Sequence, residues 1–121
     1  MVAPSGVRQV KLASGLSVLA GLWEIAAPFA LGYANLLAPT TDAVVVGALV
    51  LVLAAIRSIG ADRETWLSWV VAALGLWLVL APFVLGYDVL TSPTSNDVGI
   101  GIVIFTLGTW AALASSWLPP R

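Results

Sequence analysis

The chain has 121 residues, of which 60% are apolar and 9% are charged, and its formal net charge is −1. A soluble domain carries about 25% charged residues, so this composition excludes an ordinary water-soluble fold. The absence of cysteine and histidine excludes disulfides, thiolate nucleophiles, imidazole metal ligands and histidine-ligated haem. The sequence has no basic stripe, so we expect no nucleic-acid partner.

The first predicted span runs from Leu12 to Tyr33 and is interrupted by a single charged residue, Glu24. Arg8 and Lys11 precede it, as basic residues precede the apolar run of a signal peptide. Because this run is longer than the usual 7–15 residues of such a peptide, we interpret it as a retained helix. About 20 helical residues cross a bilayer core of about 30 Å, so the segment is long enough to span a membrane.

Three further spans are predicted from uncharged stretches, which contain 14, 23 and 23 residues and occupy positions 43–56, 65–87 and 98–120. The two longer stretches can each cross the bilayer core. The shorter one can do so if Arg57 extends along the helix to reach the interface.

The predicted second and fourth helices each begin with a residue suited to cap a helix. Thr41 and Ser95 are the expected N-caps. Asp42 and Asp97 follow them, and we expect both carboxylates near the positive ends of the helix dipoles.

One phrase occurs twice: residues 21–33 read GLWEIAAPFALGY and residues 75–87 read GLWLVLAPFVLGY. The alignment at an offset of 54 continues beyond this phrase, and a repeat of this length predicts architecture. We predict a single all-α membrane domain over residues 1–121, with four transmembrane helices. It consists of two tandem two-helix hairpins, at about 12–60 and 65–118, related by a pseudo-two-fold axis near the membrane normal.

The basic residues all fall on one predicted face, and they are Arg8, Lys11, Arg57, Arg63 and Arg121. The loops expected on the opposite face, at 34–41 and 88–96, contain none. The positive-inside rule therefore predicts a multi-pass protein of the bacterial cytoplasmic membrane with both termini in the cytoplasm.

Each copy of the phrase contains a proline. Pro28 and Pro82 remove amides that would bond to the carbonyls of Glu24 and Leu78, so each helix should bend there. We interpret these prolines as shaping two hairpins so that they pack together. A functional hinge or a binding notch is the alternative.

Four aromatic residues belong to the same phrase. Trp23 and Trp77 are expected to pack against the bends. Tyr33 and Tyr87 are expected at the membrane interface, where tyrosine is enriched.

The doubled pattern GLW, APF, LGY and PT resembles the SPW-repeat family of small bacterial membrane proteins. A repeat of that family has two helices and contains Gly-Leu-Trp, then Ser-Pro-Trp, then Leu-Gly and an aromatic residue. Residues 27–29 and 81–83 read Ala-Pro-Phe in place of Ser-Pro-Trp. The resemblance covers residues 12–118 and implies a four-helix membrane domain. It implies no activity, and no catalytic residues can be transferred.

Glu24 is the main candidate functional residue. It lies nine residues before Tyr33, which corresponds to a depth of about 13 Å. An ionisable group near the bilayer centre costs at least about 2.5–3.5 kcal/mol and is a functional hypothesis by default. Beside the carbonyl freed by Pro28, its carboxyl can bind a proton, a cation or a polar headgroup. The equivalent residue of the second copy is Leu78, so this site is not a symmetric feature of the fold.

Structural roles for Glu24 compete with binding. It can be protonated and hydrogen-bonded to a neighbouring helix, it can pair with Arg57, or it can meet a group on another subunit. A single carboxyl without a relay partner makes a poor proton path. Arg57 itself is expected to extend to the interface at the end of its helix, with ligand binding as the alternative.

Small residues recur at fourfold spacing on the first and fourth predicted helices, and they are Ala13, Ser17, Gly21, Gly108, Ala112 and Ser116. Such stripes are typical of helix contacts in membranes. They can close the bundle, and they can equally face a partner.

From these observations we expect a non-enzymatic integral membrane protein. Its preferred role is a structural or accessory subunit that acts through helix contacts, in a homo-oligomer or a larger membrane complex. The alternative is a small transporter or channel formed on oligomerisation, with Glu24 in the pathway. The expected partners are the lipid bilayer and other membrane subunits, and we expect no catalytic residue, no cofactor and no metal.

Overall fold

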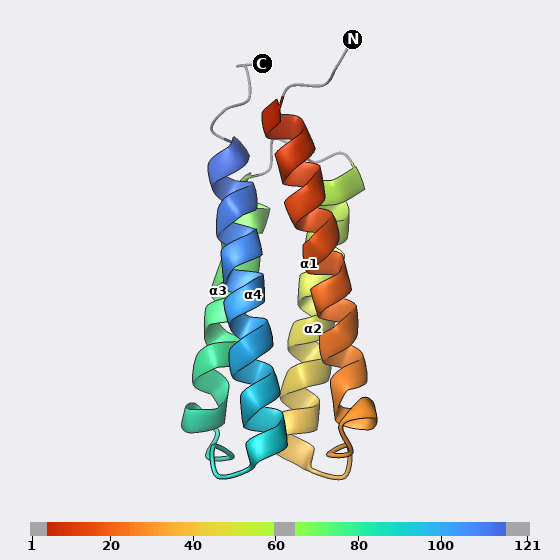
Figure 1. Cartoon of the computed structure of the whole chain (residues 1–121), viewed down its shortest axis with the longest axis vertical. Helices are drawn as coiled ribbons and strands as arrows, with labels where there is room; N and C mark the ends of the chain where they lie inside the picture. Colours follow the sequence, from red (N-terminus) through yellow and green to blue (C-terminus); the bar gives the residue numbers. More distant parts are fainter. Residues whose placement is uncertain (1–4, 60–64, 116–121) are drawn as a thin grey trace.

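The computed structural model describes residues 5–59 and 65–115 (Figure 1). These ranges form four helices and contain no strand. The helices are α1 (Ser5–Ala30), α2 (Leu37–Ile59), α3 (Thr65–Val84) and α4 (Thr91–Ser115). Each is long and apolar enough to cross a membrane. The predicted all-α fold with four spans is therefore confirmed.

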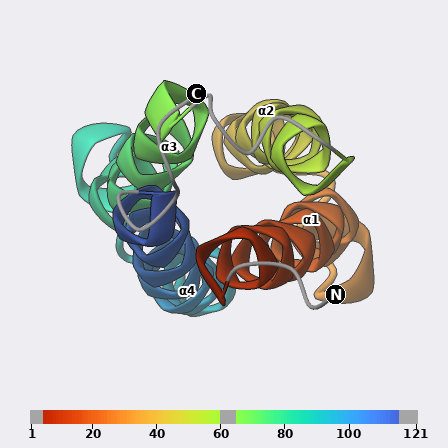
Figure 2. The same ribbon diagram turned by 90° about the horizontal axis from the view of Figure 1, so that it is seen from above.

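The four helices stand side by side and alternate in direction (Figure 1). Seen from above, they surround a common axis in the order α1, α2, α3, α4 (Figure 2). The loops at 31–36 and 85–90 lie together at one end of the bundle, which we call the loop end. The start of α1 and the end of α4 lie together at the opposite end. The closest packing joins α1 to α2 and α3 to α4, and the loosest joins α2 to α3.

Glycines allow the two closest helix pairs to approach at their backbones. A Cβ atom on Gly21 of α1 would lie 2.8 Å from the carbonyl oxygen of Gly47 on α2. A Cβ atom on Gly75 of α3 would lie 2.7 Å from the carbonyl oxygen of Gly101 on α4. The two contacts use equivalent positions of the sequence repeat, and both require the absence of a side chain. A rotation axis relating the two halves stays a prediction.

The prolines lie in the last turns of their helices. After α1, Gly32 has a φ of +84°, and the amide of Tyr33 donates to the carbonyl of Pro28 at 2.8 Å. This is a Schellman turn, in which glycine at the left-handed position ends the helix. Gly86 has a φ of +81° two residues after the end of α3, which contains Pro82. The bend expected at each proline stays a prediction.

The N-caps predicted at Thr41 and Ser95 are wrong. Each helix begins four residues earlier, so both residues lie inside a helix. The first turns instead contain Pro39 and Pro93. The first amides of a helix have no intrahelical carbonyl to bond, so a proline in this turn loses no hydrogen bond.

The outward faces of all four helices are apolar, as contact with hydrocarbon requires. Large exposed residues occur on each helix and include Leu19, Leu22, Val52, Leu76, Leu80 and Phe105. The chain is therefore a multi-pass membrane protein whose helices contact the lipid bilayer.

Candidate functional site

Three acidic residues lie at similar depth inside the bundle. Glu24 stands six residues before the end of α1, Asp42 five residues after the start of α2, and Asp97 six residues after the start of α4. At 1.5 Å per residue, each lies about 8–9 Å from the helix end at the loop end. All three side chains are buried, and Glu24 and Asp97 have no exposed surface. We call Glu24, Asp42 and Asp97 the carboxyl cluster.

The expected positions of Asp42 and Asp97 at the helix N-termini are wrong. Neither α2 nor α4 has an acidic residue in its first turn. Because both helices begin earlier than predicted, these carboxyls are carried more than one turn inward. They meet the bundle interior instead of the open helix end.

Glu24 is held by α4. Its Oε1 accepts a hydrogen bond from Nδ2 of Asn96 at 2.6 Å, and its carboxyl interacts directly with the carboxyl of Asp97. Asn96 is fixed in turn, because its Oδ1 accepts from Nε1 of Trp23 at 2.7 Å. Of the structural alternatives considered for Glu24, the geometry matches a hydrogen bond to a neighbouring helix.

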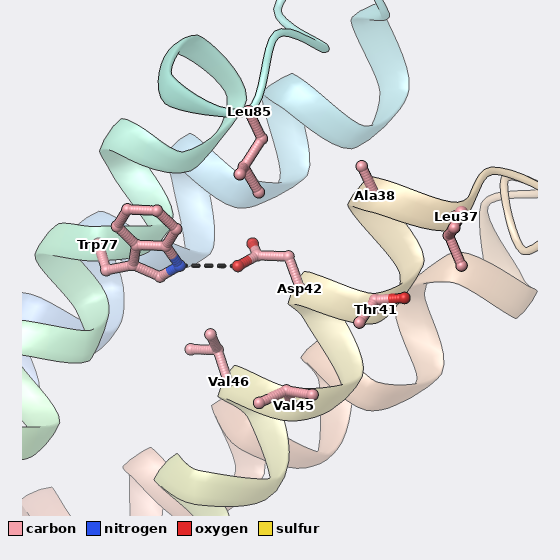
Figure 3. Close-up of a pocket in the computed structure, with 8 residues that line it drawn as sticks. All are labelled: Leu37, Ala38, Thr41, Asp42, Val45, Val46, Trp77 and Leu85. Carbon is pink, nitrogen blue, oxygen red and sulfur yellow. Dashed lines mark hydrogen bonds between the residues drawn. The ribbon is translucent and has the colours of Figure 1, made fainter.

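Asp42 is held by α3 and by the loop after it. Its Oδ1 accepts from Nε1 of Trp77 at 2.7 Å (Figure 3). The hydroxyl of Tyr87 lies 3.2 Å from Oδ2 of Asp42 and 2.5 Å from Oδ2 of Asp97. Tyr87 therefore bridges two members of the carboxyl cluster.

Tyr33 and Tyr87 lie in the loops at the loop end, and their expected position at the membrane interface stays a prediction. Their side chains are only 3% and 4% exposed, and the Tyr33 hydroxyl lies 3.4 Å from Nδ2 of Asn96. Burial raises the pKa of both phenols, and the neighbouring Asp97 adds to this shift. Both hydroxyls therefore keep their protons, and the buried polar groups draw the two rings inward.

The two tryptophans form matching bonds between the halves of the chain. Trp23 donates to Asn96 and Trp77 donates to Asp42. Positions 42 and 96 are equivalent at the offset of 54, as are positions 23 and 77. Each indole thus bonds to the second helix of the other half. Both tryptophans were predicted to have a packing role alone, so this polar role was missed, although the offset of 54 relates Asp42 to Asn96 in the sequence itself.

A groove of about 670 Å³ opens between α2 and α3 near the loop end (Figure 3). Its wall is apolar, with side chains such as Val45, Val46 and Leu85. Asp42 and Trp77 face each other across it. Asp42 is the one ionisable residue of this wall, and its side chain is 9% exposed. The groove therefore brings the edge of the carboxyl cluster near the surface of the bundle.

Two oxygens of the carboxyl cluster have no hydrogen-bond donor. Oε2 of Glu24 and Oδ1 of Asp97 are buried and unbonded. Within residues 5–59 and 65–115, no three histidine, cysteine or acidic side chains are placed to hold one metal ion. These two oxygens can therefore accept hydrogen bonds from a ligand that has donor groups.

Arg57 lies in the interior near the opposite end of the bundle. It has no exposed surface, so the prediction that it extends to the interface is wrong. Its Nε donates to Oγ of Ser68 on α3 at 2.9 Å, and a terminal nitrogen donates to the carbonyl of Ala111 on α4 at 3.4 Å. Arg57 joins three helices because these acceptors take the place of water around its guanidinium.

The small-residue stripes lie inside the bundle, apart from Ser116, which is outside the described residues. A Cβ atom on Gly108 would lie 2.6 Å from the backbone nitrogen of Ala72 on α3. Ala112 is buried, and Oγ of Ser17 donates to the carbonyl of Ala13 one turn earlier at 3.0 Å. With Gly21, which contacts α2, these residues line contacts within one chain.

The sequence profile described as the SPW repeat domain matches residues 11–111. This segment contains the whole carboxyl cluster and most of the four helices. No curated protein and no solved structure matches the chain. The profile covers most of the chain, which therefore belongs to the SPW repeat domain family.

Proposed function

We propose that the protein is a non-enzymatic structural or accessory subunit, which acts through helix contacts with its own copies or with a larger membrane complex. One observation carries this proposal. Glu24, the acidic residue within the first apolar span, is fully buried and bonded to Asn96. Glu24 thus lies between helices of one chain, and its hydrogen bond joins α1 to α4.

The parts of the chain outside the spans support the same proposal. The loops at 31–36 and 85–90 contain six residues each, which is too few to build a separate active site. The surface available to a partner is thus the apolar outer face of the helices. Without a hydrophobic driving force in lipid, a partner helix would associate through close packing on this face.

A second candidate is a small transporter or channel formed on oligomerisation. The specific observation in its favour is that Glu24 has polar neighbours. Asp97 interacts with it, and Tyr87 connects Asp97 to Asp42. Linked ionisable groups in a membrane interior are typical of proton relays. Asp97, Tyr87 and Asp42 would then serve as the relay partners that a single carboxyl lacks.

One preparation of the purified protein tests both candidates. In a mild detergent, we expect the intact particle to be heavier than one 12.5 kDa chain, either from further copies or from other membrane proteins. In proteoliposomes, we expect no more proton flux than in empty vesicles. A particle of one chain contradicts the subunit proposal. Flux that falls in Glu24→Gln but persists in Asp88→Asn, a change at an exposed loop residue, would favour the transporter instead.

We also propose that the protein lies in the bacterial cytoplasmic membrane with the loop end facing outward. Arg8, Lys11 and Arg57 lie toward the opposite end of the bundle, and the loops at 31–36 and 85–90 contain no basic residue. This distribution supports a cytoplasmic position for both termini. A phosphatase reporter fused after the last residue should stay inactive, while a fluorescent protein there should fold. An active phosphatase would reverse the orientation.

A further inference from the structure

The carboxyl cluster contains more acceptors than donors. Trp77 donates to Asp42 and Asn96 donates to Glu24. Oε2 of Glu24 and Oδ1 of Asp97 receive no hydrogen bond, although both residues have no exposed surface. An ionised carboxyl group can only accept. Two carboxylates that interact in a dry interior would repel each other and leave these oxygens unsatisfied.

The contacts of Tyr87 also indicate that the carboxyl cluster needs an additional proton. Its hydroxyl has one proton but lies within hydrogen-bond distance of both Asp42 and Asp97. The phenol can donate to one carboxylate only. The second contact becomes a hydrogen bond when the other carboxyl is protonated and donates to the phenol oxygen. A full set of bonds therefore requires protons beyond those of the surrounding indole, amide and phenol groups.

The described basic side chains do not supply this compensation. Arg57 stands fifteen residues after Asp42 on α2, which is about 22 Å along the helix. Arg8 and Lys11 precede Glu24 by sixteen and thirteen residues on α1, or about 20–24 Å. Among the described residues, the acidic and aromatic polar side chains that surround Glu24 are Asp42, Asp97, Tyr33, Tyr87, Trp23 and Trp77.

We propose that Glu24 and Asp97 share a proton and form a proton-binding site, which Tyr87 connects to Asp42 at the wall of the groove between α2 and α3. The ligand is a proton because the two carboxyls interact directly and because no three acids of the described chain are placed around one metal ion. Pairs of carboxyls that share one proton are established chemistry in other proteins. This inference concerns proton binding and holds equally for a subunit and for a transporter.

The bridge gives the site a route for proton exchange. A protonated Asp42 donates its proton to the oxygen of Tyr87. The original O–H bond of Tyr87 breaks, and that proton passes to Oδ2 of Asp97. Tyr87 ends with one proton, Asp42 becomes the carboxylate, and total charge is conserved. Asp42 can then be protonated again from the groove, where its side chain is 9% exposed.

Infrared spectroscopy of the purified chain in detergent tests the site. At neutral pH we expect the carbonyl-stretch band of a protonated carboxyl, shifted in heavy water. The band should weaken in Glu24→Gln and in Asp97→Asn, because the new amide donates where the shared proton did. It should persist in Asp88→Asn, the exposed acidic control. Sodium chloride should leave the band in place.

A wild-type spectrum without this band overturns the proposal. This measurement uses the wild-type protein alone, so it does not depend on whether a variant folds. A band of unchanged intensity in both folded variants overturns it too, as does displacement of the band by sodium, which would make a metal cation the ligand. For the route, Tyr87→Phe should slow deuteration of the band several-fold, while Tyr33→Phe should not. Equal deuteration rates in these two variants would overturn the connection through Tyr87. A failed flux assay would leave the binding site unaffected.

Discussion

The substitution Gly75→Val is expected to force α3 away from α4 and to destabilise the native bundle strongly. A Cβ atom at this position would lie 2.4 Å from the backbone nitrogen of Phe105 and 2.7 Å from the carbonyl oxygen of Gly101. Both neighbours are backbone atoms of a membrane helix, so they cannot move aside as a flexible side chain can. Overpacking in a well-packed core costs about 1–3 kcal/mol, and the two further methyl groups of valine bring the expected loss to at least the upper end of this range.

The matched control is Gly99→Val. Gly99 also lies in a membrane helix, but nothing lies within 4 Å of a Cβ built on it. We expect a change within about 0.5 kcal/mol there, as at other surface positions. Thermal unfolding of both variants in the same detergent, followed by circular dichroism, makes the comparison. Equal melting temperatures for the two variants would show that the close α3 and α4 contact does not form.

The second large effect is expected for Arg57→Ala. The substitution removes the donors that bond to Ser68 on α3 and to the carbonyl of Ala111 on α4, so these hydrogen bonds between helices are lost. A hydrogen bond to a charged group contributes about 1.5–3 kcal/mol, and the cavity left by the side chain adds to the loss. We therefore expect several kcal/mol of destabilisation, together with loosened contacts between α2 and α4.

Two further variants make this prediction specific. Arg8→Ala removes the same charge from an exposed side chain and should change stability by no more than about 0.5 kcal/mol. Arg57→Lys keeps the charge but loses the forked guanidinium, so it should recover only part of the stability. Denaturant unfolding in detergent measures all three. The prediction is wrong if Arg57→Ala is as stable as Arg8→Ala.

Much of the fold could be predicted because its causes are local in the chain. The length and hydrophobicity of each span decide that it forms a helix across lipid, where every backbone amide must be bonded internally. The helix starts were less predictable, because Thr41 resembles an N-cap while the proline two residues earlier is tolerated in a first turn. A shift of four residues moved Asp42 from the expected helix end into the interior.

The candidate site was only partly predictable. Glu24 stood out because it is an acid within an apolar span, but its partner Asn96 lies 72 residues away. A separation of 73 residues hid the role of Trp23 in the same way, because its indole bonds to Asn96. The repeat relates position 42 to position 96. An alignment of the chain with itself does not, however, predict that Asp42 bonds to Trp77 and Asn96 to Trp23.

The sequence by itself determined that this chain enters a membrane as four helices, because transfer of apolar residues from water depends on composition and length. Only the tertiary structure decided that Glu24, Asp42 and Asp97 meet and that Arg57 turns inward. The direction in which a side chain points depends on the rotation and depth of its helix within the bundle. Both are set by the glycine contacts between helices, such as Gly21 with Gly47, and these contacts exist only once the helices have packed.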